Sequence, residues 1–402
     1  MEIRADLHIH SKYSRATSPN MDLESLSKSA KIKGLDVLAT GDFTHPKWIS
    51  EIDSKLEEDK GLLKFKKSKD NFRFILATEI SSIYKKNGKC YRNHNIIILP
   101  SIEAAKNFNK RLVDLKCNIS SDGRPIVGLD PKKLIEIAME CDPKFMFIPA
   151  HIWTPWFSLF GSKSGFDKME DCFEEYTPFI KACETGLSSD PEMNWLVSQL
   201  DNVNLVSNSD CHSPENIARE CNVFDCDVSY DGLYDVINTP NSDKFLYTVE
   251  FYPEEGKYHY DGHLKCDVCF SPEQTEKHDG LCPKCGKPLV IGVMNRVAEL
   301  SDRTLAEAKK IKKVPFKSLI PLKEIVAQKI GVGVKSQKVC KYYDNMIGLM
   351  GNELDILIKM EKSDFEKHGF DEIGDMISKM RSGQVTRSPG FDGKYGKIEI
   401  KE

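Results

Sequence analysis

The sequence lacks several features that define common classes of protein. No apolar run approaches the roughly 18 residues of a membrane-spanning helix, so we expect no membrane segment. No apolar leader precedes the charged residues at the start, so we expect no signal peptide and a cytoplasmic protein. The glycine-rich fingerprint of dinucleotide-binding sheets is also missing. With 402 residues, 40% hydrophobic and 29% charged, the composition indicates an ordinary soluble chain of two or three domains.

Disulfides are not expected, although the chain has 13 cysteines. Nine of these cysteines are scattered along the sequence, and the other four form two Cys-x-x-Cys pairs. Scattered cysteines in a chain without a leader are typical of reduced thiols.

Charge is distributed unevenly along the chain. Residues 303–341 contain eleven Lys or Arg and two Glu, whereas the whole chain has a net charge of -4. A basic segment attached to an acidic body predicts a polyanionic partner.

Two histidines, His8 and His10, end the first apolar segment. Side chains two residues apart in a strand point the same way, so both imidazoles can bind one metal ion. An isolated histidine is more often a hydrogen-bonded loop or core residue. Here, however, further metal-competent residues lie at the ends of later apolar segments, which favours a metal centre. They are Asp42, His45, Glu79, His94, His151, Asp210 and His212.

Apolar segments alternate with helical patterns over residues 1–240. This alternation predicts an α/β fold with a parallel sheet, and the length fits a closed barrel. Predicted helices cover residues 23–33, 101–115 and 131–140. In such barrels the reactive groups gather at the C-terminal ends of the strands, where most of these ligands fall. His94 differs because it precedes its apolar segment.

Five motifs resemble those of the polymerase and histidinol phosphatase (PHP) superfamily of metal-dependent phosphoesterases. They are Asp-Leu-His-Ile-His-Ser, Gly-Asp-Phe-Thr-His, Thr-Glu-Ile, Pro-Ala-His-Ile-Trp and Ser-Asp-Cys-His. The resemblance implies a distorted (β/α)7 barrel that binds two or three divalent ions (Zn, Mn, Mg or Fe). It also implies the ligands: His8, His10, Glu79 and Asp210 for one ion, Glu79, His94 and His151 for a second, and His212 for a third.

The chain departs from the superfamily pattern at the third metal site. The second motif of the superfamily usually reads Thr-Asp-His, whereas here Gly-Asp42-Phe is followed by His45. We therefore expect Asp42 as a ligand and His45 as the substitute ligand. Arg15 stands where many members have His or Asp, and we assign it to phosphate binding. Asp210, Glu79 and Arg15 are the catalytic candidates, because two close ions activate water and hold both reacting oxygens.

An aromatic segment follows His151 and includes Trp153 and Trp156. It has two interpretations, a local core or a stacking wall for a base removed from its duplex.

Two Cys-x-x-Cys pairs, Cys266 with Cys269 and Cys282 with Cys285, are separated by twelve residues. This spacing predicts a zinc ribbon whose four thiolates hold a structural zinc ion. His263 and His278 lie nearby but are surplus to a four-cysteine site.

The basic segment contains Gly331-Val-Gly333 between two helical patterns, which resembles a helix-hairpin-helix element. Such hairpins hold a DNA phosphate, so we expect Gly331, Gly333, Lys335 and Lys338 to bind DNA. A plain helix–helix turn is the alternative.

The order of barrel (1–240), zinc ribbon (241–300) and small, basic, mainly helical C-terminal region (301–402) is similar to the endonuclease Q family. The resemblance implies a DNA-repair endonuclease acting on double- or single-stranded DNA. Such an enzyme would cut 5′ to uracil, hypoxanthine, xanthine or an abasic site and leave a 3′-hydroxyl and a 5′-phosphate. We expect a monomer, with a sliding-clamp contact left open. There are two alternative functions. The first is a small-molecule phosphatase like histidinol phosphatase, which would leave the ribbon and the basic segment without a role. The second is a DNA-binding scaffold without metals, which would not need the intact ligand set.

Overall fold

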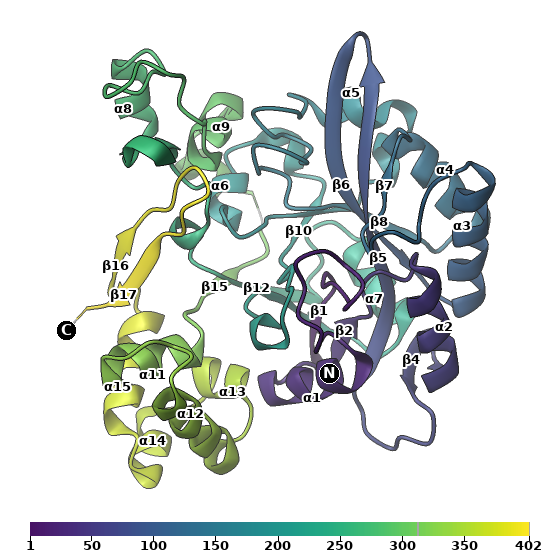
Figure 1. Ribbon diagram of the computed structural model, residues 1–402. Coiled ribbons are helices and arrows are strands. Elements are labelled where there is room, and N and C mark those ends of the chain that lie inside the picture. The colour runs from purple at the N-terminus through teal and green to yellow at the C-terminus, as the bar shows by residue number, and fades with distance from the viewer. Residues whose placement is uncertain (312, 402) are drawn as a thin grey trace.

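The computed structural model describes residues 1–311 and 313–401, and it is built around a mixed sheet (Figure 1). Strands β1 (Glu2–Asp6), β2 (Val37–Ala39) and β5 (Arg73–Lys86) are parallel neighbours. β6 (Lys89–Leu99) and β8 (Met146–Pro149) then continue the sheet with antiparallel pairing. The chain is thus a mixed α/β fold. The predicted parallel pairing holds for β1, β2 and β5, but not for the rest of the sheet described so far.

The turn between β5 and β6 explains the antiparallel pairing. Asn87 and Gly88 both have positive φ angles, 51° and 80°, as in the two-residue turns that connect hairpin strands. Parallel neighbours would need a long crossover instead. In Figure 1 this hairpin projects beyond the body of the protein.

The other side of the sheet uses later parts of the chain. β11 (Cys221–Asp225) is antiparallel to β1, β12 (Phe245–Glu250) is antiparallel to β11, and β15 (Phe316–Ser318) is parallel to β12. The sheet therefore extends past residue 240, where the sequence places a domain boundary. The remaining strands of this region are β3 (Leu56–Asp59), β4 (Leu62–Phe65), β7 (Ile126–Val127), β9 (Ala182–Glu184) and β10 (Asn204–Val206).

The predicted helices of the first 240 residues are confirmed and pack one face on the sheet. In α3 the apolar residues Ala105, Phe108 and Leu112 are buried at helical spacing, and the Ser101 side chain caps the first turn by accepting from the Ala104 N–H. The longer helices here are α1 (Leu23–Lys33), α2 (Pro46–Lys55), α3 (Ile102–Asp114), α4 (Pro131–Cys141) and α7 (Tyr230–Ile237). The shorter ones include α5 (Met169–Phe173) and α6 (Pro191–Asn194).

Residues 253–311 form a smaller unit around a short hairpin. It consists of β13 (Asp261–His263), β14 (Val268–Phe270), α8 (Pro272–Lys277), α9 (Val293–Leu300) and α10 (Leu305–Ala308).

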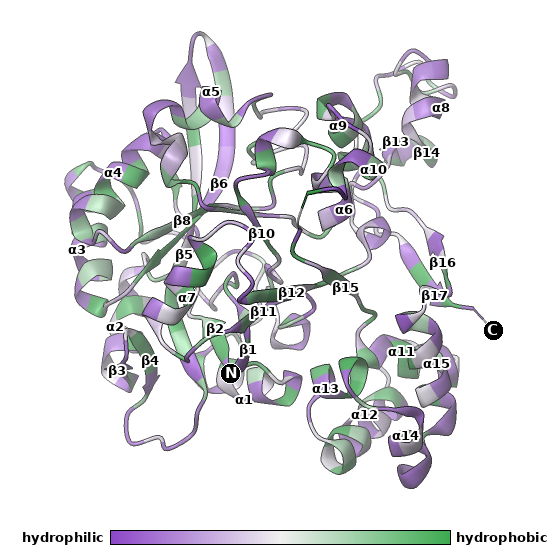
Figure 2. Ribbon diagram, turned by 180° about the vertical axis from the view of Figure 1, so that it is seen from behind, coloured by the Kyte–Doolittle hydropathy of each residue, from purple (hydrophilic) through white to green (hydrophobic). Residues whose placement is uncertain are grey.

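The C-terminal region is mainly helical, as predicted. Its elements are α11 (Leu322–Ile330), α12 (Gln337–Met350), α13 (Glu353–Ile358), α14 (Lys362–His368) and α15 (Asp371–Arg381), followed by the hairpin of β16 (Val385–Ser388) and β17 (Lys397–Ile400). Two ion pairs join α13 to the sheet region: Arg4 to Asp355 and Lys33 to Glu353, each 2.6 Å long. In Figure 2 the strands β8 and β12 are mostly hydrophobic, whereas α14 is mostly hydrophilic. None of the helices in the described part of the chain is long and apolar enough to cross a membrane.

Candidate metal centre

The two histidines after β1 face a pair of carboxylates. Nε2 of His10 lies 3.2 Å from Oε2 of Glu79 and 3.1 Å from Oδ1 of Asp210. Nε2 of His8 lies 3.6 and 3.7 Å from the same two oxygens. These four side chains are close enough to share one metal ion. Two neutral imidazoles and two carboxylates suit a divalent transition metal.

Each of these histidines is held on the outer side of its ring by another carboxylate. Nδ1 of His8 lies 3.0 Å from Oε1 of Glu184, and Nδ1 of His10 lies 3.0 Å from Oδ1 of Asp42. This arrangement fixes the ring so that Nε2 faces the site. Nε2 of His8 is buried and has no hydrogen-bond partner among the described residues, as expected for an atom reserved for a metal.

A second group uses the other oxygen of Glu79. Oε1 of Glu79 lies 2.7 Å from Nδ1 of His94 and 3.2 Å from Nε2 of His151. Glu79 therefore stands between two groups of ligands, in the position of a bridging carboxylate. His94 precedes its apolar segment because β6 runs antiparallel to β5, which brings it beside Ser81, two residues after Glu79.

Charge at the centre keeps the carboxylates ionised. Burial raises the pKa of Glu79, but the Arg124 guanidinium and the histidines around the carboxylate outweigh burial and hold that pKa well below its usual value. Arg124 donates from Nη1 to Oε2 of Glu79 at 3.0 Å, a contact that the sequence did not predict. Burial lowers the pKa of His94 to about 4, so its imidazole is neutral, as a metal ligand must be.

The residues expected at a third metal site lie around the two groups without joining either. Asp42 binds Ser11 and Ser14 as well as His10. His45 stacks on Tyr13, with ring centroids 4.3 Å apart. The ring of His212 lies 4.6 Å from that of His10. The third metal site stays a prediction.

Arg15, expected to bind phosphate, is exposed on the loop after the first motif. Its Nε lies 3.3 Å from Oδ2 of Asp122. Its assignment to phosphate binding also stays a prediction.

Three residues at the centre have a strained backbone conformation. Asp42, His151 and Asp210 all have positive φ angles, 49°, 29° and 44°, which side-chain-bearing residues rarely adopt. Next to His151, a Cβ on Gly186 would lie 2.7 Å from the His151 Cβ, so this position needs glycine. Such strain persists where the surroundings over-determine it, as at functional sites.

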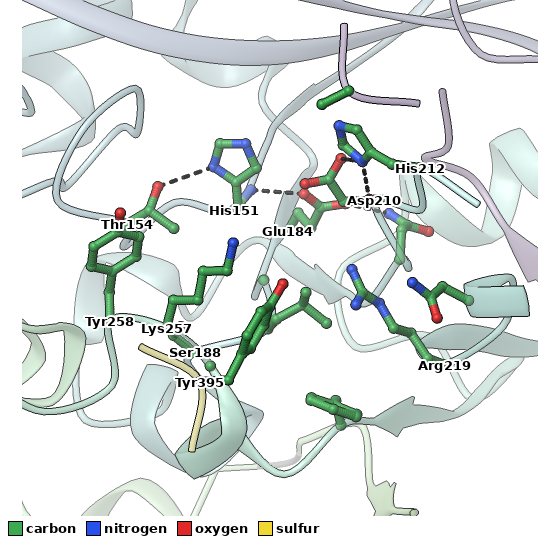
Figure 3. Close-up of a pocket in the computed structure, with 17 residues that line it drawn as sticks. His151, Thr154, Glu184, Ser188, Asp210, His212, Arg219, Lys257, Tyr258 and Tyr395 are labelled. Atoms are coloured by element: carbon green, nitrogen blue, oxygen red, sulfur yellow. Dashed lines mark hydrogen bonds and ion pairs between the residues drawn. The ribbon is translucent and has the colours of Figure 1, made fainter. Parts of the chain in front are cut away.

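A cavity of about 450 Å³ opens beside the two groups of candidate ligands (Figure 3). Asp210, His151 and His212 line one side of it, and Arg219 adds a cation. Its other wall includes Lys257, Tyr258 and Tyr395, which come from parts of the chain beyond the first 240 residues. Nζ of Lys257 lies 4.5 Å from the ring centroid of Tyr395. Sequence reasoning missed this wall because the residues have no common spacing.

The aromatic segment after His151 divides into a core part and a pocket part. Trp153 is 1% exposed, packs on Phe160 and donates to Oδ1 of Asn194 at 2.7 Å. Its prediction as a DNA-stacking residue is wrong, because a buried ring offers no face to a base. Trp156 is partly exposed and lies edge-on to Tyr258 at 5.9 Å.

A separate cluster, His263 with Cys266, Cys282 and Cys285, lies in the small unit. The structure brings together three of the four predicted zinc ligands, and His263 joins them in place of Cys269.

The predicted DNA-binding hairpin lies between α11 and α12. Gly331 ends α11 with a φ of 73°, and Gly333, Lys335 and Lys338 are exposed. Ser336 caps α12 by accepting from the Val339 N–H at 3.3 Å.

Comparisons with known proteins give matches over part or all of the chain. Residues 321–384 match the model of the MJ0043 C-terminal domain. The uncharacterized protein MJ0043 of Methanocaldococcus jannaschii is 33% identical over 254 residues, but this match covers 62% of the chain and only 31% of that protein. The uncharacterized protein YqxK of Bacillus subtilis is 28% identical, with 99% of both chains covered.

Two solved structures match the whole chain. The lesion-specific endonuclease PfuEndoQ of Pyrococcus furiosus matches with a TM-score of 0.87, 30% identity, and coverage of 100% of this chain and 96% of that one. Endonuclease Q in complex with a 27-mer duplex, which carries an abasic lesion at the active site, matches with a TM-score of 0.85 and 29% identity. That match covers 100% of this chain and 97% of the other.

Proposed function

Because this chain belongs to the endonuclease Q family, we propose that it is a metal-dependent DNA-repair endonuclease that cuts at lesions. The observation that carries the proposal is the pair of ligand groups sharing Glu79 beside a cationic cavity. The full-length match to a relative solved with an abasic duplex adds support.

The residues present fit a metal pair on a PHP-type barrel. His8, His10, Glu79 and Asp210 would hold one divalent ion, and Glu79, His94 and His151 would hold the other. The unpartnered Nε2 of His8 supports this assignment. Two such ions supply an activated water and neutralise charge on both reacting oxygens.

The chain's own residues orient the ligands and bind the substrate. Glu184 and Asp42 hold the rings of His8 and His10 in place. Arg124 stands at Glu79 and would contact the phosphate at the cut, since a guanidinium offers a forked donor. Lys257 and Arg219 at the cavity would bind the flanking phosphates.

The cavity would accept the damaged nucleotide outside the duplex. Extruding a paired base costs a few kcal/mol, and less where pairing is already weak. Uracil, hypoxanthine or xanthine opposite the partner of the original base pairs weakly, and an abasic site does not pair, so selection for lesions follows from this cost. Tyr258 and Tyr395 offer ring faces to an extruded base.

The remaining parts would bind DNA without reading its sequence. The exposed hairpin from Gly331 to Lys338 would hold a backbone phosphate through its amides and lysines. The small unit around β13 and β14 would contribute a structural zinc site. A cytoplasmic monomer is the simplest setting for this activity.

The test is a gel of end-labelled duplexes incubated with purified protein and Mn²⁺ or Zn²⁺. We expect one nick 5′ to a uracil or an abasic site, with a 3′-hydroxyl and 5′-phosphate at the nick, and no cutting of intact duplex. Asp210→Asn should lose cutting but retain duplex binding in a gel-shift assay, because it removes one ligand charge and leaves the DNA-binding surface unchanged. Equal cutting of undamaged duplex would contradict the lesion selectivity.

A free phosphomonoester in the same experiment tests the small-molecule phosphatase alternative. Its hydrolysis without any nicking of damaged duplex would favour that alternative.

A further inference from the structure

The β13–β14 hairpin has two distinct faces. In an antiparallel pair, directly opposed residues share a face and consecutive residues alternate between faces. His263 is opposite Val268, and Gly262 is opposite Cys269. His263 and Cys269 therefore belong to opposite faces.

The face of His263 and Val268 looks toward the second cysteine pair. Val268 is buried in a small apolar cluster with Cys282 and Leu289. Nδ1 of His263 lies 3.6 Å from Sγ of Cys285. Ligand atoms of His263, Cys266, Cys282 and Cys285 all lie within 4.8 Å of one another.

The face of Gly262 and Cys269 is covered by the segment that follows β16. A Cβ added to Gly262 would lie 2.3 Å from a ring carbon of Phe391. The Cys269 thiol points at the carbonyl oxygen of Pro389, 3.9 Å away. Tyr260, just before β13, bridges to Phe391 and donates its N–H to the Gly390 carbonyl at 2.9 Å. For Cys269 to face the metal, every side chain of β14 would have to turn to the opposite face of the hairpin.

The distances suit zinc held by three sulfurs and one nitrogen. Zn–S bonds of about 2.3 Å and Zn–N bonds of about 2.0 Å at a tetrahedral angle separate S from N by about 3.5 Å. The His263 to Cys285 distance is 3.6 Å. His263 and Cys266 are separated by two residues, as are Cys282 and Cys285, so each pair wraps one turn around the ion.

We propose that the small unit binds zinc through His263, Cys266, Cys282 and Cys285, and that Cys269 is a free thiol packed against the C-terminal segment. A neutral imidazole in place of a thiolate makes this site one unit less negative than a four-cysteine site, which matters next to a polyanion. The proposal does not depend on the nuclease function.

The test compares zinc content in two single variants of the full-length protein. After dialysis against a weak chelator, zinc per chain is measured by plasma mass spectrometry, with Cys282→Ser as the reference for a lost site. We expect His263→Ala to lose one equivalent, as Cys282→Ser does, and Cys269→Ser to keep the wild-type content. Loss of zinc from Cys269→Ser, or full retention in His263→Ala, would overturn the proposal.

A third variant separates ligand loss from misfolding. His263→Cys restores a thiolate on the same face, and we expect it to regain the equivalent that His263→Ala loses. X-ray absorption of the small-unit zinc should lose one nitrogen at about 2.0 Å and gain one sulfur at about 2.3 Å in this variant. No change in the number of sulfur neighbours would also overturn the proposal.

Discussion

The carboxylate of Glu184 lies 3.0 Å from Nδ1 of His8, on the side of the ring away from the metal group. The same carboxylate accepts the backbone N–H of His151 at 2.8 Å and the side-chain amide of Asn208 at 3.0 Å. It is completely buried. One side chain outside both ligand groups thus orients a histidine in each.

Glu184→Gln should therefore weaken metal binding without removing a ligand. The amide keeps the shape but loses the charge that makes His8 a better donor, and such changes cost roughly 10–100-fold in metal affinity. Competition with a chelator of known affinity measures the change. Glu175→Gln, at an exposed carboxylate, is the matched control and should bind metal like the wild type. Unchanged metal affinity in Glu184→Gln would show that the contact between Glu184 and His8 does not contribute to metal binding.

Arg124→Gln should reduce cutting while metal content is preserved. Arg124 is partly buried, and a hydrogen-bond donor aimed at developing charge is typically worth about 10²–10³-fold in rate, which a neutral amide cannot fully replace. We expect Arg124→Lys to recover only part of the loss, because an ammonium lacks the forked geometry. Single-turnover kinetics on an abasic duplex give the rate, and Arg111→Gln at an exposed pair with Glu140 is the control. If Arg124→Gln lost metal instead, the role of Arg124 would be to hold Glu79 in position.

Lys335→Ala combined with Lys338→Ala should weaken binding of damaged and intact duplex alike. Each lost phosphate contact lowers the log–log dependence of affinity on salt by about 0.9, so two contacts lower it by about 1.8. Titrations at several salt concentrations measure this slope. The control is the pair Lys67→Ala and Lys69→Ala, exposed lysines on the loop after β4 that make the same charge change. Equal slopes for wild type and hairpin variant would contradict the predicted role.

Glu353→Gln should loosen the attachment of the helical region. The Glu353 carboxylate is buried, pairs with Lys33 at 2.6 Å and accepts from the Tyr343 hydroxyl at 2.6 Å. Removing one partner leaves a buried uncompensated charge and costs about 3–5 kcal/mol. Denaturant unfolding at pH 7 measures the loss, and Lys33→Met with Glu353→Gln should restore part of it.

The stability that Glu353 contributes should also depend on pH. Burial raises the pKa of Glu353, but the charge of Lys33 and the hydrogen bonds around the carboxylate outweigh burial and lower it overall. A lowered pKa in the folded state stabilises above the unfolded value of about 4.3 and loses that effect as pH falls through the folded value. The unfolding free energies of wild type and Glu353→Gln should therefore converge in acid. A constant difference at all pH values would contradict this assignment.

The residues that the structure gathers into two candidate ligand groups could be found from sequence because each follows or precedes an apolar segment. Spacing could not show which side of a strand faces a metal, so the predicted set included Cys269 and passed over His263. The antiparallel course of β6 had a readable signal in the Asn87-Gly88 dipeptide, which is a strong hairpin marker. Arg124, Lys257 and Tyr395 had none, because they reach the site through long-range topology. The burial of Trp153 also depends on neighbours such as Phe160 and Asn194 that no local pattern reveals.

The pairing of β1 with β11 has a consequence for the time course of biosynthesis. One edge of β1 stays uncovered until residues 221–225 have left the ribosome. At 5–20 residues per second this wait lasts roughly 10–40 s, during which an unpaired strand edge is open to aggregation. His8 and His10 emerge at the start of that interval and Asp210 near its end, so the nascent chain cannot assemble its first ligand group before most of the sheet has been translated. Translation speed and chaperone supply should thus affect the yield of metal-loaded protein more than the supply of metal early in synthesis.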